Sequence, residues 1–199
     1  EIYDSLDRIS ETGPLRPVQE HILKTWTEKI YAQRDLIIKL HTGEGKTLIG
    51  LLIAQSKINS TQSPALYICP NKYLAQQVIM EANKFGIHYC EIGNDNVLPD
   101  EFLDGKKLLI THIQKLFNGK SIFGLNNESV QVGTIILDDS HACIDSIKNS
   151  FTIKFNSDHK LYKYFLKALE EDIREQGEGS FLEIENGDFN TMLPIPYWT

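Results

Sequence analysis

A glycine-rich segment, Thr42-Gly43-Glu44-Gly45-Lys46-Thr47, lies between a short apolar run and a longer stretch with helical spacing. Glycine accepts backbone angles that other residues avoid, so this segment can curl until successive N–H groups point inward. The start of the following helix adds partial positive charge at the same place. Lys46 would then reach the β and γ phosphates of a nucleotide, and the Thr47 hydroxyl would bind Mg²⁺. The sequence predicts a phosphate-binding loop between a strand and a helix.

Strands and helices are expected to alternate along the rest of the chain. Apolar residues at three-to-four spacing behind Pro17 predict a first helix. The predicted helices cover 17–31, 46–58, 72–85, 113–117 and 158–176, and the predicted strands cover 35–40, 65–69, 87–92, 108–111 and 134–138. Short, uniformly apolar strands separated by helices favour a mostly parallel sheet buried on both faces. We therefore expect an α/β fold with three αβα layers.

Composition and charge exclude several classes of protein. The 199 residues are 41% hydrophobic and 24% charged, which is typical of a folded domain. No apolar run approaches the roughly 18 residues of a membrane helix, and no signal peptide is visible. We therefore expect a cytoplasmic protein without membrane contact, and a piece of a longer chain because it begins at Glu1. The net charge of −7 means that any polyanion must be held by specific groups.

The three cysteines predict core packing rather than cross-links. Cys69, Cys90 and Cys143 form an odd set without C-x-x-C spacing, and two of them lie in apolar runs. We expect buried thiols in a reducing compartment, with neither disulfides nor a zinc site.

A second polar cluster, Asp138-Asp139-Ser140-His141, ends the predicted strand 134–138. Ligands of open parallel sheets bind beyond the carboxyl ends of the strands, so we expect this cluster to face the glycine loop. Asp138 would hold Mg²⁺ directly or through water, and Asp139 would orient and deprotonate an attacking water. His141 would hydrogen-bond away from the site. An alternative is that the two acids only cap the next helix.

Together these segments resemble the first RecA-like domain of superfamily 2 helicases and translocases of the DEAD/DEAH-box type, over about residues 14–145. Gly43 to Thr47 is similar to motif I, although Leu40 replaces its usual first glycine. Asp138 to His141 is similar to motif II of the DExH branch, with Asp139 in place of the family's Glu and so one methylene shorter. The resemblance implies ATP and Mg²⁺ as cofactors. The catalytic residues it implies are Lys46, Asp138, Asp139 and His141, with Thr47 and Asp138 at the metal.

Weaker matches follow in the family's order. Leu15 to Gln19 is similar to the segment that reads adenine, with Gln19 pairing with the base, Arg16 supporting the pocket and Tyr3 stacking on it; a plain helix start is the alternative. The nucleotide-binding set implied by the resemblance is Arg16, Gln19, Thr42, Gly43, Glu44, Gly45, Lys46 and Thr47. Segments similar to motifs Ia and Ib imply contacts with a nucleic-acid backbone at Pro70, Asn71, Lys72, Thr111 and His112. Ordinary helix caps remain open for these positions.

The predicted organisation is one RecA-like lobe over residues 1–150, with 151–199 as an extension of it or the start of an insertion. The family needs a second RecA-like domain for its arginine fingers and half of its nucleic-acid track, and none appears here. We expect an ATP-binding lobe of a DNA or RNA helicase or translocase, weakly active by itself. The alternatives are a motor for another polymer, as in protein translocation, and a nucleotide-gated scaffold.

Overall fold

The computed structural model describes residues 2–10, 12–41 and 43–195. It contains two compact units, Glu1–Phe151 and Thr152–Thr199, and each is described by itself. Within the described ranges, no helix is both long enough and apolar enough to cross a membrane.

The first unit is built around one parallel sheet. Its strands are β1 (Ala65–Cys69), β2 (Tyr89–Cys90), β3 (Leu108–His112) and β4 (Thr134–Leu137), in the order β2-β3-β1-β4. Every neighbouring pair is parallel, which confirms the predicted α/β fold with a parallel sheet. The register sets Cys69 beside His112 and Ile68 beside Leu137, so the carboxyl ends of β1, β3 and β4 meet at one edge.

Helices connect these strands. Those of the first unit are α1 (Ile2–Ser5), α2 (Pro17–Thr25), a π-helix (Trp26–Ile30), α3 (Lys46–Thr61), α4 (Lys72–Lys84), α5 (Asp100–Leu103), α6 (Ile113–Leu116) and α7 (Ser140–Ser150), with a 3₁₀ turn at 126–128. The predicted helix over 17–31 is therefore an α-helix that continues as one π-helical turn. The helices predicted after the glycine loop and after β1 begin at Lys46 and Lys72 as expected.

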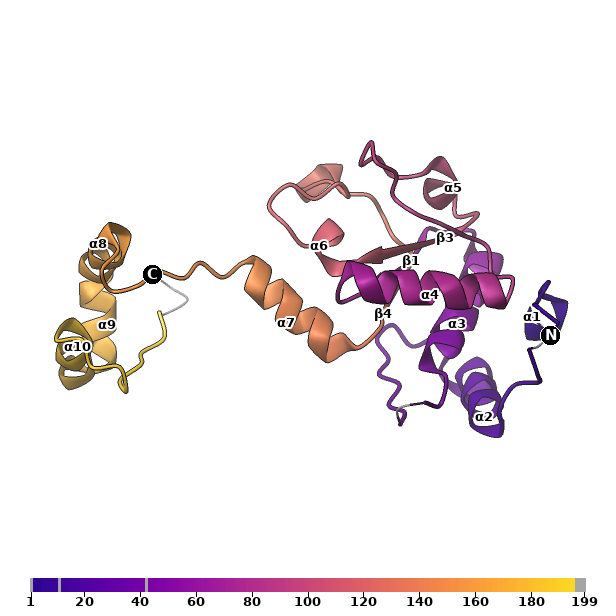
Figure 1. The fold of residues 1–199 in the computed structure, drawn as a ribbon, viewed down its shortest axis with the longest axis horizontal. Helices are drawn as coiled ribbons and strands as arrows, with labels where there is room; N and C mark the ends of the chain where they lie inside the picture. Colours follow the sequence, from indigo (N-terminus) through magenta and orange to yellow (C-terminus); the bar gives the residue numbers. More distant parts are fainter. Residues whose placement is uncertain (1, 11, 42, 196–199) are drawn as a thin grey trace. The chain divides into compact units, whose positions relative to one another are not determined.

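Side-chain alternation along β1 produces the three layers. Tyr67 and Cys69 pack into a core shared with α3 and α4, whereas Leu66 and Ile68 pack into a second core shared with α5, α6 and α7. Figure 1 shows α3 and α4 beside the sheet, with α5 and α6 around its other side. Each fully buried aliphatic side chain in these cores contributes about 1.5–3 kcal/mol. All three cysteines are buried, as predicted.

The predicted strand over 35–40 is wrong. The segment begins with a bend and belongs to no strand, and Ile37 is 90% exposed. Ile38 and Leu40 instead pack on the cluster formed by Trp26 and Ile49. The apolar side chains are thus buried on one side only, without a neighbouring strand to pair with their backbone groups.

Two further expectations are only partly met. The strand predicted over 87–92 is reduced to the two residues of β2. β4 is not buried on both faces, because Ile135 and Leu137 are 50% and 39% exposed. β4 lies at the end of the strand order, where one face and one edge have fewer neighbours.

The second unit contains three helices, α8 (Lys160–Ala168), α9 (Glu170–Gln176) and α10 (Glu178–Glu185). The helix predicted over 158–176 is interrupted at Leu169, and α10 follows the predicted break at Gly177. Arg174 organises the acidic segment, since it binds the carboxylates of Glu170 and Glu178 and stacks over the Phe181 ring.

Candidate functional site

The glycine loop has the curled backbone that its sequence predicts. Gly43 and Gly45 have φ angles of +87° and +75°, in the left-handed region that favours glycine. Gly45 is the N-cap residue of α3, so the loop leads directly into the helix that begins at Lys46. The Glu44 carboxylate accepts a hydrogen bond from the backbone N–H of His41 at 3.1 Å, which closes the loop across its base. Thr42 lies outside the described residues.

Gln19 and Arg16 support this loop from the first helix. Gln19 is 5% exposed, and its Nε2 donates to the carbonyl oxygen of Gly45 at 3.3 Å. Its Oε1 accepts from the backbone N–H of Arg16 at 3.0 Å, while the Arg16 guanidinium donates to the carbonyl of Gly43. A Cβ added at Gly45 would lie 2.2 Å from Gln19 Nε2, so this contact requires glycine. Both ends of the Gln19 amide are thus used within the protein.

Tyr3 does not have an open face for adenine. Its ring is 6% exposed, its hydroxyl donates to the carbonyl of Gly13 at 2.6 Å, and the Arg8 guanidinium covers it at 4.0 Å. The ring also packs against Phe85 in the core of α3 and α4. The stacking role predicted for Tyr3 therefore does not fit this structure.

Asp138 follows β4 at the same edge of the sheet. Its backbone N–H donates to the carbonyl of Ile68 at 2.9 Å, which holds it beside the end of β1. Burial raises the pKa of the Asp138 carboxyl; the Lys46 charge opposes this increase, and the Asp139 charge adds to it. The charge of the loop lysine therefore acts on the first acid of the second motif.

The Tyr67 hydroxyl links these two motifs. Tyr67 lies at the centre of β1 and is 1% exposed. Its hydroxyl interacts with the side chains of Thr47 and Asp138. Burial raises the pKa of Tyr67 well above its usual value, and the Asp138 charge raises it further. The phenol therefore stays protonated, which lets it donate to the carboxylate and accept from the Thr47 hydroxyl.

Asp139 and His141 are arranged differently from Asp138. Asp139 is the N-cap of α7, with a φ angle of +50°, and its Oδ1 accepts from the backbone N–H of Ala142 at 3.4 Å. Aspartate is one of the few residues that tolerate this backbone region and cap helices well. His141 is exposed in the first turn of α7. Capping thus occupies one oxygen of Asp139, as the alternative interpretation of the sequence proposes.

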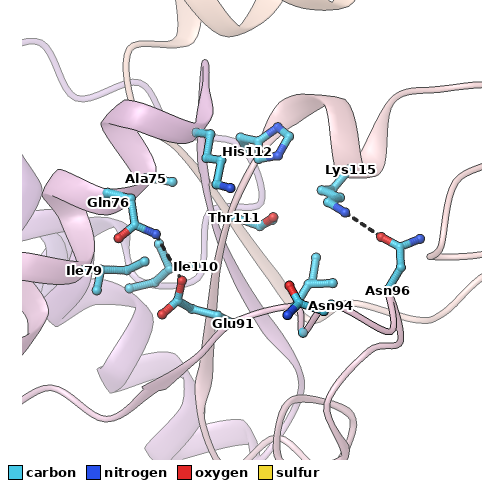
Figure 2. Close-up of a pocket in the computed structure, with 13 residues that line it drawn as sticks. Ala75, Gln76, Ile79, Glu91, Asn94, Asn96, Ile110, Thr111, His112 and Lys115 are labelled. Carbon is cyan, nitrogen blue, oxygen red and sulfur yellow. Dashed lines mark hydrogen bonds between the residues drawn. The ribbon is translucent and has the colours of Figure 1, made fainter.

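Three of the five positions resembling motifs Ia and Ib, but not Pro70 or Asn71, line a cavity of about 270 Å³ beyond the end of β3. Asn71 caps α4 by accepting from the backbone N–H of Leu74 at 2.9 Å, and Lys72 is exposed beside it. Thr111 is 5% exposed and His112 is half-buried. Figure 2 shows Thr111, His112 and Lys115 around this cavity. The structure therefore brings Lys72, Thr111 and His112 together.

Hydroxyl and carboxylate oxygens from Thr47 and Asp138 are of the type that Mg²⁺ prefers. Their common contact with Tyr67 keeps the two side chains close together, and the desolvated Asp138 carboxylate is stabilised by a nearby cation. In the described part of the chain, no three His, Cys, Asp or Glu side chains form a metal-binding cluster. These two side chains fit a magnesium ion whose other ligands are phosphate and water oxygens.

Sequence reasoning missed Tyr67 and Ser146. The Ser146 hydroxyl donates to the carbonyl of Pro70 at 3.4 Å, which ties α7 to the end of β1. The signal for Tyr67 is its polarity within an otherwise apolar strand, Ala65 to Cys69. A buried tyrosine usually needs a partner for its hydroxyl, and the nearest polar motifs supply it.

A comparison with protein-family models matches residues 12–175 to the family described as type III restriction enzyme, res subunit. The chain belongs to this family. The Res-family domain is the N-terminal RecA-like ATPase domain of a superfamily 2 helicase, which confirms the resemblance seen in the two motifs. The Res-family assignment also makes this an ATP-dependent, helicase-like domain. Comparisons with curated proteins and with solved structures gave no match.

Proposed function

We propose that the chain is the ATP-binding lobe of a motor that moves along or unwinds DNA. The family description concerns restriction enzymes, and this is what favours DNA over RNA. A second RecA-like domain in the full-length protein would complete the ATP site and the nucleic-acid track. Residues 1–150 would form the lobe, and 151–199 would extend it or begin an insertion.

One observation carries this proposal. The Tyr67 hydroxyl contacts both Thr47, next to the glycine loop, and Asp138, at the end of β4. These residues are more than 90 positions apart in the sequence, and a shared buried partner supports a common ligand site for them. The attraction between Lys46 and Asp138 supports the same arrangement.

Different side chains of the protein would bind the phosphates, the Mg²⁺ ion and the attacking water. The loop amides and Lys46 would bind the phosphates, and Arg16 and Gln19 would keep the loop in its curled form through Gly43 and Gly45. Thr47 and Asp138 would hold Mg²⁺, which neutralises negative charge on the phosphates. Asp139 would orient and deprotonate a water molecule, with His141 beside it on the same helix.

The cavity residues would hold the DNA backbone. Lys72 and the start of α4 offer a cation and free N–H groups to one phosphate, and Thr111 and His112 offer polar groups to the next. In a protein with a net charge of −7, such a contact must be local rather than spread over a wide surface.

Calorimetry with ATP, in Mg²⁺ and in EDTA, tests the nucleotide site of this chain. Binding that requires Mg²⁺ and disappears in Lys46→Ala is the expected result, with Lys39→Ala as a control outside the loop. Fluorescence anisotropy with single-stranded DNA and RNA, with and without an ATP analogue, tests the nucleic-acid track. Absence of Mg²⁺-dependent ATP binding would overturn the proposal.

A further inference from the structure

The cavity beyond β3 lies where the chain connections diverge. After β1 the chain continues into α4, in the layer with α3, whereas after β3 it continues into α6, in the layer with α7. Neighbouring parallel strands whose connections leave toward opposite layers create a crevice at their carboxyl ends, and ligands of open α/β sheets bind there. Side chains from both α4 and α6 line this cavity.

The cavity combines an apolar floor with a polar rim. Ile79 and Ile110 form apolar walls, and Lys72 and Lys115 contribute cations. Its volume of about 270 Å³ is just below the usual range for small-molecule pockets, about 300–1,000 Å³. The volume is sufficient for a single nucleobase.

Hydrogen-bond acceptors lie opposite these cations. Gln76 Nε2 donates to Glu91 Oε2 at 3.3 Å, which places these two exposed side chains side by side. Figure 2 shows this pair on one side of the cavity and the Lys115–Asn96 hydrogen bond on the other. The Glu91 carboxylate and the Gln76 carbonyl oxygen can both accept from an amino group, and a carboxylate repels a carbonyl oxygen placed against it.

One of the residues that line the cavity, His112, carries a polar atom without a hydrogen-bond partner among the residues that the structure describes. Its Nδ1 is buried, and no hydrogen-bond partner for it exists within the described ranges of the chain. A buried polar atom without a partner costs about 1–3 kcal/mol.

We propose that this cavity takes one unstacked base with an exocyclic amino group, cytosine or adenine, from single-stranded DNA. The base lies against Ile79 and Ile110, its amino group donates to Glu91 and Gln76, and the adjoining phosphates contact Lys72 and Lys115. This inference rests on the proposed function, because it needs a nucleic-acid track at the same edge of the sheet. It adds a preference among bases to what is otherwise a contact with the backbone.

The test compares oligodeoxycytidine with oligodeoxyuridine, about 12 nucleotides long, by fluorescence anisotropy. Cytosine has an amino group at C4 and an acceptor at N3, whereas uracil has an oxo group at C4 and an N–H at N3. We expect this chain to bind oligodeoxycytidine about fivefold more tightly, at the lower end of a base-specific contact. Gln76→Ala and Glu91→Ala should remove the preference, whereas Gln77→Ala, at the next exposed position of α4, should retain it. Lys72→Ala should weaken the binding of both oligonucleotides.

The outcomes separate the inference from the proposed function. If neither oligonucleotide binds, the nucleic-acid track itself is wrong. If both bind equally, or if the preference survives Gln76→Ala and Glu91→Ala, the base pocket is wrong and the track is retained. If free deoxycytidine monophosphate binds as tightly as the oligonucleotide and depends on Gln76, the cavity is a mononucleotide site rather than part of a DNA track.

Discussion

A Cβ atom added to Gly50 would lie 2.9 Å from Cε2 of Tyr67 and 3.3 Å from its hydroxyl oxygen. Gly50 lies one helical turn after Thr47 on α3, so both residues face the same strand. The absence of a side chain at Gly50 lets the Tyr67 ring pass beneath the helix and reach Thr47 and Asp138. Position 50 requires glycine because of close packing against Tyr67, not because of its backbone conformation.

Gly50→Ala should therefore destabilise the protein despite the better helix propensity of alanine. Overpacking a rigid buried ring costs about 1–3 kcal/mol, whereas the propensity gain is about 1 kcal/mol. We expect a net loss of up to about 2 kcal/mol in the free energy of unfolding, measured with urea. Gly179→Ala in α10 is the control, because a Cβ there meets nothing within 4 Å. A stabilised Gly50→Ala variant would show that the Tyr67 ring can shift.

Tyr67→Phe should weaken Mg²⁺-dependent ATP binding with little loss of core packing. Removal of the hydroxyl frees the side chains of Thr47 and Asp138, which would no longer be held close together. We expect calorimetry to show a rise in Kd of about fivefold to tenfold in Mg²⁺ and a smaller change in EDTA, as for the loss of one ordinary hydrogen bond of about 1 kcal/mol. Tyr89→Phe is the matched control, because its hydroxyl accepts only a surface hydrogen bond from Asn83. An equal change in Kd for Tyr67→Phe and Tyr89→Phe would show that the Tyr67 hydroxyl has no role in the ATP site.

Local patterns predicted much of the fold. The α3 and α4 helices and the β1, β3 and β4 strands were predicted at or within a few residues of their observed bounds, because glycine, proline and apolar spacing mark them directly. The segment over 35–40 was mispredicted because pairing in a sheet depends on a neighbouring strand far away in the sequence. Its own apolar residues could not reveal that only Ile38 and Leu40 would be partly buried.

The candidate site was predictable as two motifs but not as one arrangement. Spacing identified the glycine loop and the acidic pair, and parallel topology predicted that they share an edge of the sheet. The hydroxyl that connects them belongs to Tyr67, which lies in neither motif. The use of Gln19 as a support for Gly45 also depends on a contact between residues 26 positions apart, which no local pattern encodes.

Asp138→Asn should stabilise the protein at neutral pH in the absence of Mg²⁺. Burial raises the pKa of Asp138 above its usual value of 3.8, so the native state holds this proton more tightly than the unfolded state does. Stability from this group is present at low pH and is lost as pH rises through the native pKa. Thermal unfolding should show a higher Tm for Asp138→Asn at neutral pH and no difference below about pH 3.8. The same variant should lose Mg²⁺-dependent ATP binding. A lower Tm at neutral pH would contradict this account.

Two substitutions of Asp139 should distinguish its role as a helix cap from its role in ATP hydrolysis. Asparagine caps helices as well as aspartate and tolerates the same backbone region, so Asp139→Asn should change stability by less than about 0.5 kcal/mol. It should abolish ATP turnover but spare ATP binding, because it cannot accept a proton from water. Asp139→Ala should also lose about 1 kcal/mol of stability with the cap. Unchanged turnover in Asp139→Asn, measured by phosphate release, would assign the base to another residue.

His112 should make DNA binding depend on pH. Burial lowers the pKa of His112 below its usual 6.5, and the charges of Lys115 and Lys72 lower it further. Glu91, the carboxylate that lines the same cavity, is held by Gln76. A DNA phosphate against these cations would reduce their repulsion and raise the pKa of His112, so binding takes up a proton.

Affinity for DNA should therefore increase as pH falls from about 8 to about 5.5, which spans the usual titration range of histidine. Calorimetry in buffers with different ionisation enthalpies measures this uptake directly. His112→Asn should bind with an affinity that no longer changes over this range, and a pH profile identical to that of the unmodified chain would exclude His112 as the titrating group.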